Sequence, residues 1–176
     1  MHILMCNDDG ILADGLRQLA TYLSQYYRVT VVAPATEQSA KSHALTTEIP
    51  LKLDAYNGED ENPRLYALTG TPSDCMKFGL SYLLADDMPD LVISGINHGF
   101  NLGSDVLYSG TVSAAMESAF YGIPGLALSV ERYSIERGHE MHPFIHELIE
   151  KIYVNGNFEG LLNVNFPLRG LCDWDH

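Results

Sequence analysis

The sequence contains no long apolar run and few basic residues. No stretch approaches the roughly 18 consecutive apolar residues of a membrane-spanning helix, and the first residues lack the basic start, apolar middle and small-residue cleavage site of a signal peptide. Lysine and arginine number 10 against 23 acidic residues, a formal net charge of -13, and they form no basic stripe of the kind that binds long nucleic acids. We therefore expect a soluble, cytoplasmic protein that binds neither a membrane nor a nucleic-acid polymer.

Cysteine and several nucleotide-binding or catalytic motifs are also scarce or missing. The three cysteines, Cys6, Cys75 and Cys172, are widely spaced and form no CxxC pair, which argues against a disulfide framework and against a thiolate zinc site. The patterns GxGxxG, GxxxxGK[ST] and GxSxG do not occur. Their absence removes the usual support for a dinucleotide oxidoreductase, a P-loop NTPase and a serine hydrolase.

Short apolar runs alternate with stretches of helical periodicity along all 176 residues. This alternation predicts one α/β domain, residues 1–176, with a mostly parallel sheet. The expected strands lie at residues 2–6, 28–33, 51–55, 65–68, 90–94, 125–130 and 161–166. The expected helices lie at residues 16–23, with Asp14 as the cap, and at about 73–84, 111–121 and 142–153.

Two adjacent carboxylates, Asp8 and Asp9, follow the first predicted strand in the sequence MCNDDG. Two unit charges about 4 Å apart at a protein surface repel by roughly 4 kcal/mol, so a compensating interaction is expected. Gly10 makes a turn easy, which would let the two side chains converge. One interpretation is a divalent-cation site, and the other is an exposed acidic turn or a helix cap.

Polar loops follow several of the predicted parallel strands, and ligands bind outside the carboxyl ends of such strands. Ser39 in EQSAKS offers a hydroxyl oxygen, and Asn97 in SGINHGFNLG offers a carbonyl oxygen. With Asp8 and Asp9 they make an all-oxygen ligand set that suits Mg²⁺ or Mn²⁺, and Ca²⁺ less clearly. Residues 95–110 form a predicted loop of a length that is usually functional or disordered.

Ser109, Gly110 and Thr111 begin a predicted helix in YSGTVSAAMESA. The unpaired N–H groups at a helix start suit a phosphate, and the alternative is a plain Ser or Thr N-cap. In TGTPSD, capping by Thr71 or Ser73 is favoured over ligand binding.

Histidines supply further candidates. In HEMHPFIH, His139, His142 and His146 are interpreted as a solvated helix start, because the pattern is not HExxH and no third zinc ligand is evident. His43 and His98 lie in the predicted site loops and are candidate proton donors.

Five motifs occur in the order NDDG, VVAPATEQSAKSHALT, TGTPSDC, SGINHGFNLGSDVLYSGTVSAAMES and LNVNFP. Together they resemble the SurE family of nucleotidases, from Met1 to about Pro167. The resemblance implies a Rossmann-like, three-layer α/β fold. It also implies a metal-dependent phosphatase acting on nucleoside 5′- or 3′-monophosphates and sometimes on short polyphosphate. Its implied site residues are Asp8, Asp9, Ser39 and Asn97 around one divalent ion (Mg²⁺ or Mn²⁺), and Ser109, Gly110, Thr111 and Asn101 around the phosphate.

The sequence departs from the family pattern in two places. Ala40 and Lys41 follow Ser39 where the family usually has Gly-Ala. Members also usually continue past LNVNFP into a segment exchanged between subunits, whereas this chain stops within nine residues of Pro167. We therefore expect a SurE-like domain without that segment, in which the family's homo-oligomer is weakened or altered.

The resemblance leads to a mechanistic hypothesis with two alternatives. The metal held by Asp8 and Asp9 would offset charge in the transition state, with one aspartate, preferably Asp8, taking the proton of the attacking water. One alternative is a truncated metal-binding protein without activity. The other is a receiver-like signalling domain, which would need a third aspartate and a lysine that DLVISG and GLALSV do not supply.

Overall fold

The computed structural model describes residues 1–38, 41–58 and 60–167. Within these residues one sheet has the order β3-β4-β2-β1-β5-β6-β7, and β3 alone is antiparallel to its neighbour. The strands are β1 (His2–Cys6), β2 (Arg28–Pro34), β3 (Leu53–Ala55), β4 (Arg64–Leu68), β5 (Leu91–His98), β6 (Gly125–Val130) and β7 (Leu161–Phe166). The predicted α/β fold with a mostly parallel sheet is confirmed.

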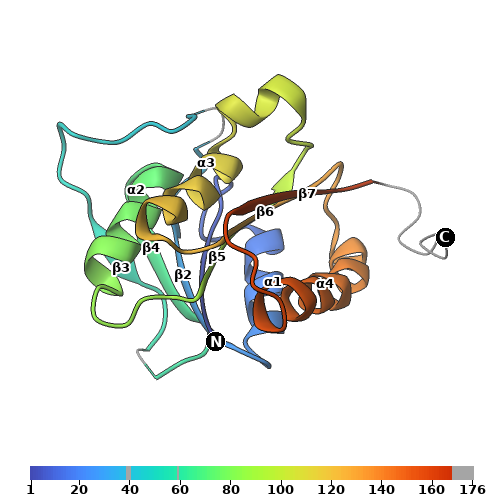
Figure 1. The fold of residues 1–176 in the computed structure, drawn as a ribbon. Helices are drawn as coiled ribbons and strands as arrows, with labels where there is room; N and C mark the ends of the chain where they lie inside the picture. Colours follow the sequence, from blue (N-terminus) through green and yellow to red (C-terminus); the bar gives the residue numbers. More distant parts are fainter. Residues whose placement is uncertain (39–40, 59, 168–176) are drawn as a thin grey trace, which may run out of the picture.

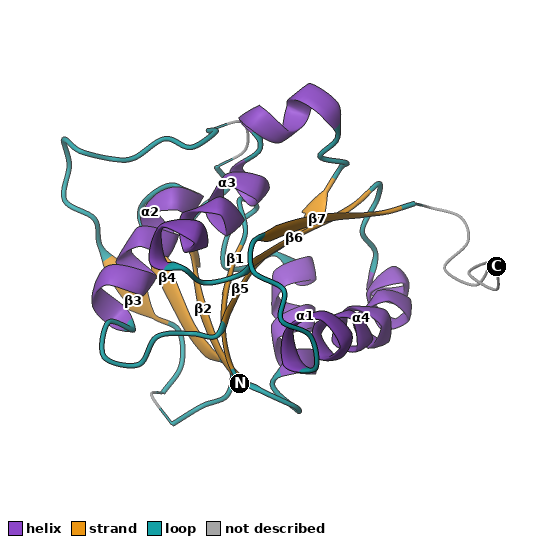
Figure 2. Cartoon of the chain, in the orientation of Figure 1, coloured by secondary structure: helices purple, strands orange, loops and turns teal. Residues whose placement is uncertain are grey.

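Helices cover both faces of this sheet (Figure 1). In the described part of the chain, the α-helices are α1 (Asp14–Leu23), α2 (Pro72–Phe78), α3 (Gly110–Glu117) and α4 (Ile135–Ile149). Helices α1 and α4 lie together on one face, and α2 and α3 lie together on the other (Figure 2). This arrangement confirms the three-layer, Rossmann-like architecture. In the described part of the chain, no helix combines the length and apolar character needed to cross a bilayer.

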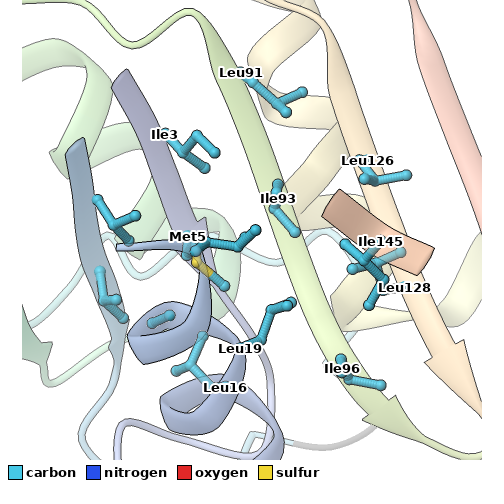
Figure 3. Close-up of a cluster of buried hydrophobic side chains, with 14 of the residues drawn as sticks. Ile3, Met5, Leu16, Leu19, Leu91, Ile93, Ile96, Leu126, Leu128 and Ile145 are labelled. Atoms are coloured by element: carbon cyan, nitrogen blue, oxygen red, sulfur yellow. The ribbon is translucent and has the colours of Figure 1, made fainter. Parts of the chain in front are cut away.

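The central strand β1 shows why its sequence is a continuous apolar run. Ile3 and Met5 point to the core under α1 and α4, whereas Leu4 and Cys6 point to the core under α2. Successive side chains alternate between the two faces, so a parallel strand covered on both faces is mostly apolar. Figure 3 shows the first of these cores, in which side chains of β1, β5 and β6 meet those of α1 and α4.

The strand order places a topological switch point between β1 and β5. From β1 the chain moves to β2 and β4 on one side, then returns to β5 on the other side of β1. The loops that follow β1 and β5 therefore run in opposite directions from the carboxyl ends of these strands and leave a crevice between them. Ligands usually bind in this crevice in such sheets. This crevice contains the loop that carries Asp8 and Asp9.

Two predicted helix starts are wrong. Asp14 is the first residue of α1 and not its cap; the N-cap is Ala13, which makes no side-chain capping bond. Helix α4 begins at Ile135, capped by the Ser134 hydroxyl, which accepts the Arg137 N–H. The prediction placed this start seven residues too late because Pro143, a residue typical of a first turn, lies inside the helix.

The remaining predicted boundaries need smaller changes. Helix α2 starts at Pro72, and its N-cap is Thr71 in a capping box with Asp74. Regular α-helix ends at Phe78 and at Glu117 in α2 and α3, and each helix continues in a short turn of different pitch.

The predicted loop at residues 95–110 is partly regular. Strand β5 continues to His98, and a 3₁₀ turn covers Gly103–Tyr108. The pairing with β6 shifts between Ser94 and Asn97, as in a β-bulge, which re-aims side chains beside many active sites. At the bulge a Cβ on Gly95 would lie 2.3 Å from a backbone oxygen of β6, so only glycine fits.

Candidate active site

The turn after β1 is held by Asn7. Its side-chain nitrogen donates to the Gly10 carbonyl at 3.1 Å, and its Oδ1 accepts the Gly10 N–H at 3.0 Å. Gly10 has φ +102, a conformation that glycine adopts readily. The Ile11 N–H then donates to the Pro34 carbonyl at 2.8 Å. Asn7 therefore fixes the turn that carries Asp8 and Asp9 beyond the end of β1. The predicted convergence of the two side chains stays a prediction.

Asp8 is buried against the start of α3. Its Oδ1 accepts the hydroxyl of Thr111 at 2.6 Å, and a Cβ on Gly110 would lie 3.0 Å from the Asp8 Cβ. Only 7% of Asp8 is exposed. Burial raises the pKa of Asp8, although the hydrogen bond from Thr111 acts in the opposite direction. The structure thus joins two predicted site segments that lie about a hundred residues apart.

Asp9 is half-buried in a strongly acidic environment. Burial, and then the charges of Asp8 and Glu37, raise the pKa of Asp9 to about 6, and His98 partly opposes this. Carboxylates whose pKa values rise in this way are costly to ionise without a positive charge nearby. Such groups mark functional sites more often than chance.

The start of α3 has the features expected of either a cap or a phosphate site. Ser109 is the N-cap, and its Oγ accepts the Val112 N–H at 3.1 Å. The N–H groups of Gly110 and Thr111 belong to the first turn, where no acceptor exists within the helix. The cap is therefore confirmed, and the phosphate role of residues 109–111 stays a prediction.

Of the other two predicted metal ligands, the structure describes Asn97 but not Ser39. Asn97 lies at the carboxyl end of β5, next to β1, and its Nδ2 donates to the Gly99 carbonyl at 2.8 Å. This bond uses the amide nitrogen and leaves Oδ1 as the atom that could coordinate a cation. Ser39 lies outside the described residues. Gln38, its neighbour in the chain, donates its N–H to the Asp8 carbonyl at 2.8 Å.

Asn101 is buried among the ends of β6 and β7. Its Nδ2 donates to the Ser129 hydroxyl at 2.8 Å, and its N–H donates to Asn165 Oδ1 at 2.9 Å. Its carbonyl accepts the side-chain amide of Asn163 at 2.8 Å. These bonds anchor the loop after β5, and the predicted phosphate contact of Asn101 stays a prediction.

The candidate histidines occupy three different places. His98 lines a cavity with Asp9. His43 Nε2 lies 3.2 Å from Glu117 Oε1, at the opposite end of α3, about 10 Å from its first turn at 1.5 Å per residue. His142 is 3% exposed, so its interpretation as part of a solvated helix start is wrong: the helix begins earlier and its inner face packs on α1. The described residues contain no group of three His, Cys, Asp or Glu side chains placed to hold a metal.

Sequence reasoning missed several residues around the site. Asn7 carried a signal, since asparagine and glycine are both common in turns, where the asparagine side chain bonds to nearby backbone groups. The hydrogen bond between Thr111 and Asp8 joins distant segments and left no local signal. Tyr133, which lines the same cavity as Asp9, follows the carboxyl end of β6, where the strand-end rule could have found it.

The donor chemistry of the site fits a hard divalent cation. Asp8 and Asp9 supply carboxylate oxygens, and Asn97 supplies an amide oxygen, which are ligands that Mg²⁺ and Mn²⁺ accept. The raised pKa values of the two aspartates fit the same conclusion, because a cation would favour their charged forms. The residues present therefore fit the metal that the sequence predicted.

These features define a class: a doubly wound α/β protein with an acidic, oxygen-rich site at its switch point, facing a helix start. Comparison with known proteins identifies the family. The model of the SurE family (Survival protein SurE) matches residues 3–175, and the chain belongs to this family.

Relatives match over most of the chain. A protein named 5′-nucleotidase SurE from Thermoanaerobacter pseudethanolicus is 50% identical over 168 residues, which cover 95% of this chain and 66% of that protein. One of the same name from Thermosipho africanus is 47% identical over 172 residues, covering 95% and 65%. The crystal structure of the SurE protein from Aquifex aeolicus has TM-score 0.83 and 39% identity, covering 95% and 66%. The chain thus spans about two thirds of the length of these relatives.

Proposed function

We propose that the chain is a metal-dependent phosphatase that hydrolyses nucleoside 5′-monophosphates to nucleoside and phosphate. Activity on 3′-monophosphates and on short polyphosphate belongs to the same proposal. The observation that carries it is the buried Asp8, which bonds to Thr111 at the start of α3 and adjoins a second carboxylate of raised pKa. The names of the relatives, 5′-nucleotidase SurE, support the same activity.

The chain's own groups would divide the chemistry between them. Asp8, Asp9, Asn97 and Ser39 would hold one Mg²⁺ or Mn²⁺. When bound, this ion would supply positive charge that stabilises the charge developing on the phosphate oxygens. The first-turn N–H groups of α3 would bind the remaining oxygens. One aspartate, with Asp8 preferred, would accept the proton of the attacking water.

The sequence left two alternatives to the phosphatase. Membership of the SurE family decides against the receiver-like domain. The other alternative is a SurE-like protein that binds metal without turnover, and an activity measurement separates it from the phosphatase.

Turnover against a substrate panel tests the proposal. The panel contains nucleoside 5′- and 3′-monophosphates and tripolyphosphate, with Mn²⁺ or Mg²⁺ present and phosphate release as the readout. We expect release from 5′-monophosphates, and we expect Asp8→Asn to lose most of it while retaining the far-ultraviolet circular dichroism spectrum. No release above the Asp8→Asn background from any substrate would support the inactive alternative.

A further inference from the structure

A cavity of about 270 Å³ adjoins the candidate site. We call it the α1 cavity, because its wall includes the first turn of α1. Its lining residues include Asp9, Asp14, Gly15, His98 and Tyr133. These residues come from the loop after β1, the start of α1, the end of β5 and the loop after β6, so the cavity lies at the topological switch point.

The two aspartates face different elements. Asp8 bonds to Thr111 of α3, and α3 packs with α2 on one face of the sheet. Asp9 instead lines the α1 cavity, on the face covered by α1 and α4. A phosphate placed at the start of α3 would therefore have the α1 cavity on the far side of the carboxylate pair.

The walls of the α1 cavity combine one aromatic ring with polar groups. Tyr133 packs partly against the core, and its hydroxyl donates to Gln18 Oε1 at 2.9 Å, which fixes the ring. A Cβ on Gly15 would lie 3.6 Å from the Tyr133 ring and 3.0 Å from the Ile96 carbonyl. The glycine therefore lets the start of α1 come close to both, and Asp14 stands next to it at the exposed edge.

This chemistry suits a sugar. A ribose presents C–H groups, which pack on a tyrosine ring, and hydroxyls, which donate to a carboxylate such as Asp14. Carboxylates at the same edge of related folds bind ribose hydroxyls in this way. The volume lies just below the range of roughly 300–1,000 Å³ for pockets that hold drug-sized ligands. It therefore fits one part of a nucleotide and not the whole.

We propose that the α1 cavity is the subsite for the sugar of the substrate, with Tyr133 as its main contact. This inference rests on the proposed function, because it assigns the leaving-group side of the same site. A competing position exists on the other face of the sheet. There, a cavity of about 500 Å³ is lined by Glu117, Phe120 and Tyr121, among others.

Tyr133 and Tyr121 form a matched pair for the test. Both are half-buried, and each hydroxyl bonds to one side chain, Gln18 for Tyr133 and Ser81 for Tyr121. The variants are Tyr133→Leu, Tyr133→Phe and the control Tyr121→Leu, each checked by its melting temperature. The substrates are methyl phosphate, ribose 5-phosphate and AMP, which add the sugar and then the base stepwise.

We expect Tyr133→Leu to lower kcat/KM about tenfold for ribose 5-phosphate and AMP, as estimated from the worth of an aromatic contact, and to leave methyl phosphate unchanged. Tyr133→Phe keeps the ring and loses only the bond to Gln18, so it should retain most of the activity on the sugar substrates. Tyr121→Leu should change none of the three. An equal loss on all substrates, or a loss on AMP alone, would overturn the sugar assignment. So would a loss of sugar preference in Tyr121→Leu.

A binding measurement separates this inference from the proposed function. Adenosine, which has no phosphate, is titrated into the metal-free chain and followed by nuclear magnetic resonance line shifts. We expect saturable binding that Tyr133→Leu weakens about tenfold and Tyr121→Leu does not. Adenosine binding that Tyr133→Leu leaves intact would contradict the subsite, whether or not the chain hydrolyses any phosphate ester.

Discussion

At the scale of one residue, the protonation of Asp9 affects the stability of the fold. Its pKa is raised from 3.8 to about 6 in the folded chain. The folded state therefore binds a proton more tightly than the unfolded state. The contribution of Asp9 to stability is full below about pH 4 and is lost as the pH rises through 6. Without a cation, the ionised residue opposes folding at neutral pH.

We predict that Asp9→Asn stabilises the metal-free chain at pH 8. A shift of about two pKa units would correspond to about 3 kcal/mol. Solvent screening at this half-buried group reduces the expected gain in the free energy of unfolding to about 1–2 kcal/mol, and the gain disappears near pH 4. Urea unfolding of both proteins in EDTA at the two pH values measures it. A large loss of stability in Asp9→Asn at pH 8 would mean that the acidic pair has a structural role.

In the proposed reaction, Thr111 would position the carboxylate of Asp8, to which its hydroxyl donates. Thr111→Val keeps the shape and removes the hydroxyl that donates to Asp8 Oδ1, whereas Thr111→Ser retains a hydroxyl. We predict that Thr111→Val lowers kcat at least tenfold, because a hydrogen bond to a charged group is worth about 1.5–3 kcal/mol. Thr111→Ser should recover most of the loss. Steady-state kinetics with melting temperatures measure this, and equal kcat values for Val and the unaltered chain would refute it.

At the scale of elements, the sequence correctly located the strands that a short run of neighbouring residues identifies. The apolar runs of β1, β6 and β7 appear at the predicted positions. Strands buried on both faces, such as β1 and β6, are mostly apolar, and the partly buried edge strand β7 keeps enough apolar residues to be recognised. Helix α4 was misplaced because Pro143 inside it imitates a helix start. Strand β5 was cut short because its bulge places glycine and asparagine inside a strand. In both elements tertiary packing outweighs the local signal.

The candidate site shows the same difference between local sequence signals and long-range packing. The strand-end rule predicted that Asp8, Asp9 and Asn97 would lie at one edge of the sheet, since parallel strands end together. The contact between Asp8 and Thr111 depends on how α3 crosses that edge. Such crossings depend on long-range packing that no short motif encodes.

Helix α4 carries a pH-sensitive contact with α1. Burial, and then the charge of His139, lower the pKa of His142 to about 4, and its ring packs at 5.4 Å from that of Tyr22. The unfolded chain binds a proton at His142 below about pH 6.5, and the folded chain binds one only near pH 4. Stability is therefore lost as the pH falls through this range.

We predict that His142→Leu reduces this acid sensitivity. Between pH 7 and pH 4.5 the unaltered chain should lose up to about 3 kcal/mol more of its free energy of unfolding than the variant does. Urea unfolding at both pH values measures the difference. His139→Leu removes only the smaller, charge-based cause of the lowered pKa of His142, so it should leave most of the acid sensitivity in place. Equal losses in His142→Leu and the unaltered chain would contradict the burial of a neutral His142.

At the scale of the whole molecule, charge makes a cation necessary for the proposed reaction. The chain has a formal net charge of -13, and nucleotide substrates are also anions. A metal ion bound by the acidic pair reverses the local field whatever the net charge is. The weakened association expected from the sequence stays a prediction, which sedimentation over a range of protein concentrations can measure.

The most direct test of this account is AMP hydrolysis by the purified chain before and after exhaustive treatment with EDTA, followed by addition of Mn²⁺ or Mg²⁺. We predict that chelation abolishes hydrolysis and that either ion restores it. We also predict that the same ion concentration restores little activity to Asp9→Asn. Full activity after chelation, or equal restoration in Asp9→Asn, would contradict the central claim that Asp8 and Asp9 hold a catalytic metal ion.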